Sequence, residues 1–378
     1  MNLPRIFHIT ANVYSPLPAR HHSFRIWEEL AKGAEEYHVV ASAGKLRYSH
    51  SVAGNIHLHL LPTLSRRGLA YSLSSWLIVI LGIRYRPNRV VTQCPVHGGL
   101  AAVVLCSLLR IPLFTEIHGS HYFFPVRPGL RGKVESLLYR TFSRPAFRRS
   151  ARIRSLSPQM TNQLRQTYGA AIAAKAVEIP TRVDLRIFSP AKTNYDISDP
   201  LRVINVGSYL PIKAQAQLIV DLFEAYPHSR LTLVGSGPLA ERYAALAEKL
   251  GITERVRLIH AQTHNDVATL LAESDVYVQY SRAEGVSRAV FEAMAMGLPV
   301  VTTPVGFVEG VLAHDRDVLV LGSAGSETLA AAISQLTGSE ELRARLGRHA
   351  RRRVEDEFEW NSVFSRYRQA IATCGDAE

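Results

Sequence analysis

Short apolar, β-branched runs alternate with longer helical patterns along most of this chain, and the alternation starts a second time near residue 200. This alternation is typical of βαβ units, in which helices cover parallel strands. The predicted helices of the first half are His22–Lys32 and Gly98–Leu109. The predicted strands there are Arg5–Thr10, Tyr37–Ala41, Ile56–Leu61, Val90–Gln93 and Leu113–Ile117.

The second half repeats the pattern after a boundary marked by Pro180, Pro190 and the polar run Lys192–Pro200. Its predicted strands are Arg202–Val206, Leu231–Val234, Val256–Ile259, Val276–Tyr280 and Pro299–Thr303. Its predicted helices are Gln215–Ala225, Leu239–Leu250, Asp266–Glu273 and Arg288–Met296. Two doubly wound, Rossmann-like lobes are therefore expected. Ligands bind beyond the carboxyl ends of such strands, so the cleft between the lobes is the expected site.

Composition excludes several classes of protein. Of the 378 residues, 47% are hydrophobic and 20% are charged, which is a globular balance rather than a disordered one. No apolar stretch approaches the roughly 18 residues that cross a bilayer, and the first residues lack the pattern of a signal peptide. Cys94, Cys106 and Cys374 are scattered, so neither a disulfide framework nor a zinc site is expected. A reducing cytoplasm is the expected location.

Positive charge is concentrated in the first half of the chain. Residues 1–200 contain 26 Lys and Arg against 10 Asp and Glu, whereas the remaining residues contain 18 against 22. The asymmetry indicates an anionic partner, such as a membrane surface, a lipid diphosphate or nucleic acid; a solvated basic face is the alternative. Tyr71–Ile83 is flanked by arginines and is predicted either as a core helix of the first lobe or as an element that faces a bilayer.

Residues 276–306 carry the most specific information. A strand at Val276–Tyr280 precedes a loop and the helix Arg288–Met296. Ser287 is expected to cap this helix through its hydroxyl, and Gly297 suits the position that ends it. The helix then begins at the carboxyl edge of a parallel sheet, where its free N–H groups and dipole favour a phosphate.

Two glutamates flank the start of this helix. Glu284 falls on the loop and Glu292 in the second turn, so both can reach one ligand from different sides. A carboxylate accepts hydrogen bonds from two hydroxyl groups, and a sugar or ribose diol is a natural partner. Considered singly, each glutamate is best interpreted as a charged residue on the surface. Glu292, however, lies in an almost wholly apolar helix, where an unpartnered charge is costly.

The run EGVSRAVFEAMAMGLPVV, residues 284–301, closely resembles the signature of the retaining family-4 glycosyltransferases of GT-B fold, which have two glutamates separated by seven residues. Further matches follow in the family's order: the strand ends Val206–Lys213 and Leu233–Pro238, the hinge Ile179–Phe188, the histidine loop Thr115–Ser120, and Trp360. The resemblance implies an α/β GT-B fold. It implies an acceptor-binding lobe at 1–185, a nucleotide-sugar-binding lobe at 186–359, and a C-terminal helix at 360–378 that packs back on the first lobe.

The resemblance also implies roles for individual residues. The implied catalytic residues are His118 beside the reacting sugar, Glu284 at the donor sugar's hydroxyls and Lys213 at the diphosphate. The implied donor-binding residues are Gly207, Ser208, Lys213, Glu284, Gly285, Val286, Ser287 and Glu292, with Glu292 on the ribose. Residues near Ala261–Thr263 are implied to border the base.

Three departures from the family pattern affect the phosphate and acceptor contacts. Ser208 stands where the family often has an arginine, and Arg282, Arg288 or Arg182 can substitute; the sequence leaves this choice open. The hinge lacks the usual Asn-Gly, and the N-terminal loop Ser15–Arg20 lacks the usual paired glycines.

These observations predict a retaining glycosyltransferase that moves a hexose from GDP-mannose or a UDP-sugar to a sugar or lipid-linked oligosaccharide, in polysaccharide or glycolipid biosynthesis. The donor is a substrate, and no cofactor is expected. The predicted partners are this donor, a glycan or lipid-diphosphate-linked glycan acceptor and an anionic surface at the inner membrane face. No metal is expected, because the candidate histidines lack suitable neighbours in sequence: His21 with His22, His57 with His59, and His118 with His121.

Two other classes remain as alternatives. A non-catalytic nucleotide-sugar binder is suggested only by Ser208. A nucleic-acid-binding protein is suggested by the net charge of +12, but no nucleic-acid motif supports it, and no nucleic-acid partner is expected. Gly235-Ser236-Gly237 is a weak dinucleotide signal, because the third glycine of that fingerprint is absent.

Overall fold

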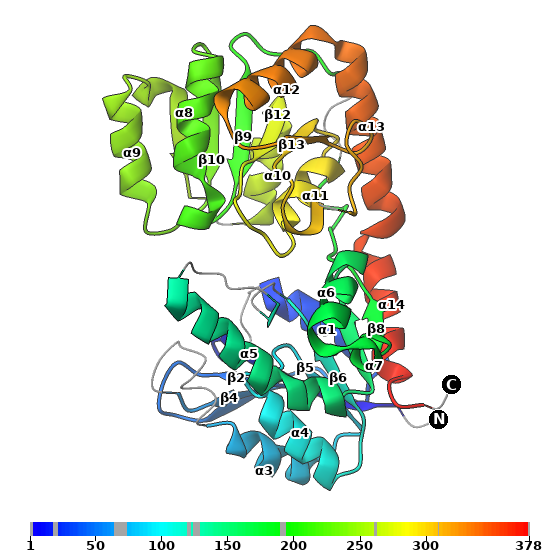
Figure 1. The fold of residues 1–378 in the computed structure, drawn as a ribbon. Helices are drawn as coiled ribbons and strands as arrows, with labels where there is room; N and C mark the ends of the chain where they lie inside the picture. Colours follow the sequence, from blue (N-terminus) through cyan, green and yellow to red (C-terminus); the bar gives the residue numbers. More distant parts are fainter. Residues whose placement is uncertain are drawn as a thin grey trace. The chain divides into compact units, whose positions relative to one another are not determined.

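The protein forms two compact units in a computed structural model, residues 1–179 with 364–378, and residues 180–363 (Figure 1). The structure describes residues 3–17, 22–63, 74–118, 122–123, 129–189, 194–260, 263–308 and 310–376. Each unit is a mainly parallel sheet covered by helices, so the predicted α/β fold with two Rossmann-like units is confirmed. Among the helices that the structure describes, none combines the length and the apolar character needed to cross a bilayer.

The first unit is built on an eight-stranded sheet in the order β3-β4-β2-β1-β5-β6-β7-β8. Its strands, from β1 to β8, are Arg5–Val13, Glu36–Ser42, Ser49–Ala53, Ile56–Leu61, Arg89–Thr92, Leu113–Glu116, Arg152–Ser155 and Ala176–Glu178. The described strand pairs are parallel except that β3 runs antiparallel to β4 at the edge of the sheet. The parallel strands therefore end at one common edge, where His118 follows β6.

Helices cover both faces of this sheet. They are α1 His22–Ala31, α3 Trp76–Tyr85, α4 Gly99–Leu108, α5 Gly129–Arg149, α6 Pro158–Tyr168, α7 Ala170–Ala173 and α14 Trp360–Ala372. Helix α3 packs against α4, and α4 against α5 (Figure 1). Buried Ile78 of α3 and Leu105 of α4 share one core with Phe7 and Val90 of the central strands. Burial of these apolar side chains is the main force that holds the layers together.

The second unit has a six-stranded sheet in the order β11-β10-β9-β12-β13-β14, with parallel pairs throughout. Its strands β9 to β14 are Arg202–Val206, Arg230–Val234, Val256–Ile259, Val276–Gln279, Val300–Thr302 and Leu319–Val320. Its α-helices α8 to α13 are Gln215–Ala225, Ala240–Lys249, His264–Ala272, Arg288–Ala295, Ser326–Gly338 and Glu340–Glu357. Its 3₁₀ turns η2 to η4 are Pro211–Lys213, Thr253–Arg255 and Gly306–Val308.

Consecutive residues of β9 enter different cores of this unit. Val203 belongs to the core under α8, α9 and α12, whereas Ile204 belongs to the core under α10, α11 and α13. Side chains alternate between the faces of a strand, and both faces here are covered. This is why the strands of the second unit are mainly apolar and could be located from sequence.

Candidate functional site

A short ion pair of the second unit joins Lys213 to Glu284. Lys213 ends the 3₁₀ turn after β9, and Glu284 lies in the loop between β12 and α11. Lys213 Nζ is 2.5 Å from Glu284 Oε1, and Ser281 Oγ donates to the same oxygen at 2.6 Å. The two side chains of the ion pair are only 22% and 9% exposed. The structure thus brings together two residues that the sequence placed at the donor's phosphate and sugar.

Backbone contacts hold the two loops in place. The N–H of Arg282 donates to the carbonyl of Ile212 at 2.8 Å, which ties the loop of Glu284 to the turn of Lys213. Gly306, with φ of +59°, packs behind Glu284, and a Cβ on it would lie 2.4 Å from the Glu284 carbonyl oxygen. The close approach requires glycine at 306, because any side chain would displace the loop.

Glu292 lies one helix turn inside α11. Its side chain is 12% exposed, and His264 Nε2 of α10 lies 3.8 Å from its Oε1. Burial raises the pKa of the Glu292 carboxyl, although nearby Arg288 opposes the change. Tyr277 of β12 is buried, and besides this burial both Glu284 and Glu292 raise its pKa well above the ordinary value. Tyr277 is therefore affected electrostatically by both glutamates.

The predicted hydroxyl cap of α11 is wrong. Ser287 does occupy the N-cap position, but its side chain makes no capping hydrogen bond. Its hydroxyl instead donates to the side-chain oxygen of Gln279 at the end of β12. A buried amide oxygen needs a donor, and the contact with Gln279 sets the direction of the Ser287 side chain, whose oxygen accepts no hydrogen bond from the helix N–H groups. The helix still begins at the carboxyl end of β12, as predicted.

The remaining predicted donor-binding residues lie on two neighbouring loops. Gly207 and exposed Ser208 follow β9, and buried Gln215 supports them by donating to the Gly207 carbonyl at 3.2 Å. Gly285 and Val286 lie between Glu284 and the helix, half-buried. Of the segment expected to border the base, residues 261–262 lie outside the described residues.

Three arginines were candidates to replace the basic residue missing at position 208. Arg282 is exposed and held next to the Lys213 turn by its own backbone N–H. Arg288 lies near Glu292. Arg182 lies over the Trp360 ring, 5.8 Å from its centroid. The backbone of Arg282 is thus linked directly to the turn that carries Lys213.

His118, in the first unit, is held by a buried carboxylate. His118 lies two residues after the end of β6 and its side chain is 42% exposed, whereas that of Glu116 is 1% exposed. The two are joined by a contact of 2.7 Å between His118 Nε2 and Glu116 Oε2. Because a carboxylate only accepts, this contact places a proton on Nε2.

Glu116 is itself surrounded by cationic and hydroxyl groups. Arg154 of β7 lies 3.0 Å from Oε2, and Tyr367 of α14 donates to Oε1. His8 Nε2 lies 3.8 Å from Oε1. Burial acts to raise the pKa of Glu116, but His118, Arg154 and His8 outweigh it and hold that pKa well below the ordinary range. The carboxylate therefore stays charged and fixes the orientation of His118.

Glu116 and Ser281 were not predicted as functional residues from sequence. Glu116 carried a usable signal, because it is the single charge in the apolar run Leu113–Ile117. Ser281 carried none, because its partner Glu284 lies three residues away on an irregular loop. Gly306 also had no recognisable signal, since its contact with Glu284 depends on the fold.

Comparison with solved structures identifies the fold class. Sucrose-phosphate synthase from Thermosynechococcus elongatus matches with a TM-score of 0.81 at 18% identity, covering 98% of this chain and 100% of that one. Anabaena HepE, solved in complex with UDP-glucose, matches with a TM-score of 0.75 at 16% identity, covering 98% and 100%. At these identities the likeness concerns the fold alone, which is the GT-B fold.

Sequence comparison identifies the family. Residues 192–353 match the family Glycosyl transferases group 1, and residues 19–181 match the glycosyl transferase 4-like domain. The chain therefore belongs to the group 1 glycosyl transferases of GT-B fold, as its resemblance predicted.

Two curated relatives show how far the similarity extends. N-acetyl-alpha-D-glucosaminyl L-malate synthase from Bacillus anthracis is 32% identical over 187 residues, which cover 48% of this chain and 48% of that protein. D-inositol 3-phosphate glycosyltransferase from Segniliparus rotundus is 30% identical over 226 residues, which cover 54% of this chain and 49% of that protein. The chain thus spans about half the length of these relatives.

Proposed function

We propose that this protein transfers a hexose from a nucleoside diphosphate sugar to an acceptor hydroxyl, with retention of the anomeric configuration. The observation that carries the proposal is the pair of Lys213 and Glu284 beside the start of α11, with Glu292 one turn further on. This set offers a cation and helix N–H groups to a diphosphate and two carboxylates to hydroxyl groups. Membership of the family and the nucleotide-sugar complex of HepE support it.

Donor binding divides between the two carboxylates. Lys213 and Ser281 both contact Oε1 of Glu284, so Oε2 is the oxygen that we assign to the hexose hydroxyls. Glu292 accepts the ribose hydroxyls. When the diphosphate binds, the ammonium group of Lys213 has three donors and bridges Glu284 to a phosphate oxygen. Arg282 adds the charge that Ser208 lacks.

The reaction proceeds on one face of the sugar. The bond between the anomeric carbon and the diphosphate oxygen breaks, and the acceptor oxygen forms its bond from the same side. The departing diphosphate takes the proton of the acceptor hydroxyl and leaves as the protonated nucleoside diphosphate. Lys213 and the N–H groups of α11 stabilise the charge that develops on it, so no divalent cation is needed at the diphosphate. His118 accepts a hydrogen bond from the reacting sugar through Nδ1.

The first unit supports an acceptor held at an anionic bilayer. Among the described residues, eleven of the seventeen large exposed apolar side chains lie on α3, α4 and α5. They follow helical spacing on each helix, so each forms one stripe: Trp76, Ile80 and Ile83; Leu100, Val104 and Leu108; Leu130, Val134, Leu137, Leu138 and Phe142. We call this set the apolar face.

Charge beside the apolar face favours an anionic lipid surface as its occupant. Exposed basic residues lie on or next to the same helices: Arg84, Arg110, Arg131, Lys133, Arg144 and Arg148. No Asp or Glu occurs in the sequence between Glu36 and Glu116. Apolar side chains that insert at the headgroup level, with basic residues that pair with anionic lipids, are the two components of interfacial binding. The acceptor is then a lipid-linked glycan at that surface.

Donor binding is tested by calorimetry with UDP- and GDP-sugars on the full chain. Lys213→Ala should weaken the preferred donor by about ten- to a hundred-fold, since a charge-assisted hydrogen bond is worth about 1.5–3 kcal/mol. Lys249→Ala, on the outer helix α9, is the control and should leave the affinity unchanged. Equal affinities in Lys213→Ala and the original protein would contradict the assigned site.

Chemistry is tested separately from binding. When the protein is incubated with the preferred donor and an acceptor that it glycosylates, the product should have the same anomeric configuration as the donor, as measured by NMR. Inversion would refute the proposed mechanism, and donor binding without any transfer or hydrolysis would favour the non-catalytic binder.

Membrane association is tested by co-sedimentation with vesicles. Vesicles that contain anionic lipid should carry the protein down, and vesicles of zwitterionic lipid alone should carry less. The double variant Leu130→Ser, Leu137→Ser should lose most of the bound fraction, whereas Leu250→Ser, at an exposed leucine of the second unit, should not. Binding that is equal for both variants would refute the role of the apolar face.

A further inference from the structure

Four histidines gather on one face of the first sheet, at the edge formed by β2, β4 and β3. The parallel pairing of β2 with β4 sets His38 beside His57, and the antiparallel pairing of β3 with β4 sets His50 beside His59. The rings of His38 and His57 are stacked with centroids 4.6 Å apart, and those of His50 and His59 with centroids 4.4 Å apart. The group forms only when β2, β4 and β3 pair, and this pairing was not predicted from sequence.

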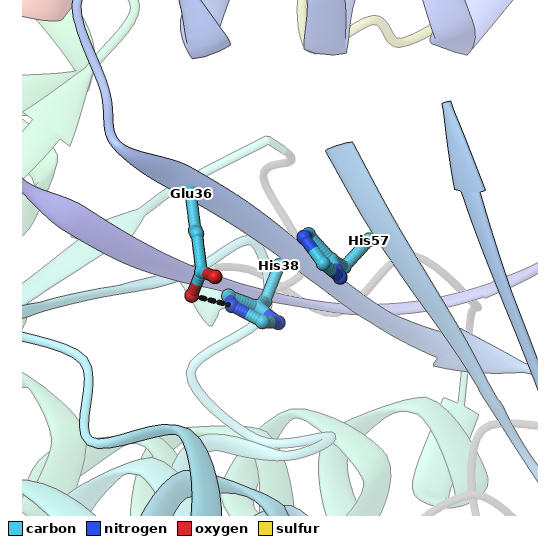
Figure 2. Close-up of side chains that lie close together, drawn as sticks. All are labelled: Glu36, His38 and His57. Atoms are coloured by element: carbon cyan, nitrogen blue, oxygen red, sulfur yellow. Dashed lines mark hydrogen bonds and ion pairs between the residues drawn. The ribbon is translucent and has the colours of Figure 1, made fainter. Parts of the chain in front are cut away.

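A carboxylate completes a ligand set. Glu36 lies two residues before His38 and therefore on the same face of β2, and its Oε2 is 3.0 Å from His38 Nε2. Glu36, His38 and His57 each offer one ligand atom, and these three atoms lie within 4.8 Å of one another. Figure 2 shows the three side chains pointing to the same region from neighbouring strands. Imidazole nitrogens and carboxylate oxygens are common zinc ligands, and one water molecule would complete the usual four-coordinate geometry.

One ring nitrogen of this group has no hydrogen-bond partner among the described residues. His57 Nδ1 is buried, and no described residue provides it with a hydrogen-bond partner. Buried polar atoms usually have a partner. A metal ion supplies one for a ring nitrogen that carries a lone pair. The side chain of Glu36 is 36% exposed, which gives an ion a way in from solvent.

The surroundings of His38 suit a metal ligand. His38 Nδ1 lies 3.0 Å from His59 Nε2, and His59 Nδ1 lies 2.9 Å from the hydroxyl of Tyr48. With His38 bound to a metal through Nε2, its Nδ1–H donates to His59, whose Nδ1–H donates to Tyr48. Each ring keeps one proton, so only the tautomers change. Such outer hydrogen bonds orient a ligating histidine and raise its basicity.

We propose that Glu36, His38 and His57 bind one divalent transition-metal ion, with zinc the best match to the ligand set. The ion replaces the hydrogen bond between Glu36 and His38. The site lies near the amino ends of β2 and β4, which begin at Glu36 and Ile56, whereas His118 follows the carboxyl end of β6. The ion is therefore structural: it fastens the β3–β4 hairpin to β2 at the edge of the sheet and takes no part in the chemistry.

Titration of the full chain, without an affinity tag and after chelator treatment, tests the proposal. Calorimetry with Zn²⁺ should give one site per chain, and Co²⁺ should give the visible bands of a four-coordinate ion. Zn²⁺ should also raise the midpoint of thermal unfolding. The absence of a stoichiometric site, or a Co²⁺ spectrum of a purely six-coordinate ion, would overturn the proposal without any variant.

Variants then locate the site. His57→Gln and Glu36→Gln should each weaken Zn²⁺ by more than about tenfold, the lower end of what even outer-shell partners contribute, and abolish the thermal shift. His228→Gln, an exposed histidine of the second unit, is the matched control and should bind as the original does. Far-UV circular dichroism checks that each variant is folded. Unchanged affinity in His57→Gln and Glu36→Gln would show that other histidines hold the ion. Donor affinity is not expected to change in these variants, so the outcome is independent of the proposed transferase site.

Discussion

Replacing Glu116 by glutamine preserves the shape of a buried side chain and removes its charge. Glu116 and Arg154 are 1% and 2% exposed, and Arg154 lies 3.0 Å from the carboxylate while its Nε donates to the Ile179 carbonyl. Loss of one partner leaves the other charge buried and uncompensated, which costs about 3–5 kcal/mol. The glutamine oxygen still accepts one hydrogen bond, so we expect about 3 kcal/mol for Glu116→Gln.

The cost should depend on pH with a defined sign. The pKa of Glu116 is held below the ordinary range by His118, Arg154 and His8, although burial opposes them. A carboxyl whose pKa is lower in the folded state stabilises it above the pKa of the unfolded chain and loses this contribution as the pH falls through the folded value. The difference between the original protein and Glu116→Gln should therefore be full at neutral pH and shrink only in acid.

Urea unfolding at neutral pH measures this cost. In a Trp360→Phe background, the buried Trp27 reports on the first unit. Glu35→Gln is the control, because Glu35 is 56% exposed and 3.9 Å from Arg5, and surface pairs contribute about 0–1 kcal/mol. A loss below about 1 kcal/mol for Glu116→Gln, similar to that of the control, would refute the argument that the buried pair is a strong structural element.

Three further predictions follow from the same structure. Burial lowers the pKa of His8 from 6.5 to about 4, opposed by Glu116 and assisted by His118 and Arg154, so unfolding takes up a proton between pH 4 and pH 6.5. The stability of the first unit should therefore fall as the pH is lowered from 6.5, and urea titrations should show a weaker fall for His8→Gln. Gly306→Ala places a Cβ against the Glu284 carbonyl and should weaken donor binding by at least about tenfold, the equivalent of about 1.4 kcal/mol. The control Gly310→Ala, also at positive φ but with no atom within 4 Å of the added Cβ, should bind the donor as the original protein does, and equal calorimetric affinities of the two variants would contradict the prediction. Because burial raises the pKa of Glu292, this carboxyl should take up a proton, and donor affinity should begin to weaken, at a higher pH than for an ordinary carboxyl as the solution is acidified. Glu292→Gln should flatten this dependence of affinity on pH, whereas the control Glu273→Gln, at an exposed residue, should keep it.

The local pattern of the sequence predicted the regular elements of the second unit best. Strand β9 and helix α8 have the predicted bounds, Arg202–Val206 and Gln215–Ala225. Their strands are buried on both faces and their helices have one apolar stripe, so periodicity alone identifies them. The predicted strand Ile56–Leu61 of the first unit is also confirmed.

Elements defined by tertiary contacts were missed. Strand β3, Ser49–Ala53, is polar and half-exposed, and it is a strand because it pairs antiparallel with β4 across the turn at Gly54. Helix α5, Gly129–Arg149, contains Pro145 and many arginines, so its helical pattern was not recognised from sequence. The Glu36, His38 and His57 cluster was missed for the same reason as β3, since it requires the pairing of β2 with β4.

A charged residue within an apolar run is a sequence feature that indicates residues of the candidate site. Glu292 was singled out because a charge in an apolar helix needs a partner. The same argument applies to Glu116, the one charge in the apolar run that ends at Ile117, and the structure places it under His118 with Arg154 and Tyr367 around it. A charge embedded in an apolar run therefore marks both Glu292, which we propose contacts the donor, and Glu116, which positions His118. Burial distinguishes them: the Glu292 side chain keeps 12% of its surface exposed, whereas Glu116 keeps 1% and has protein groups on both oxygens.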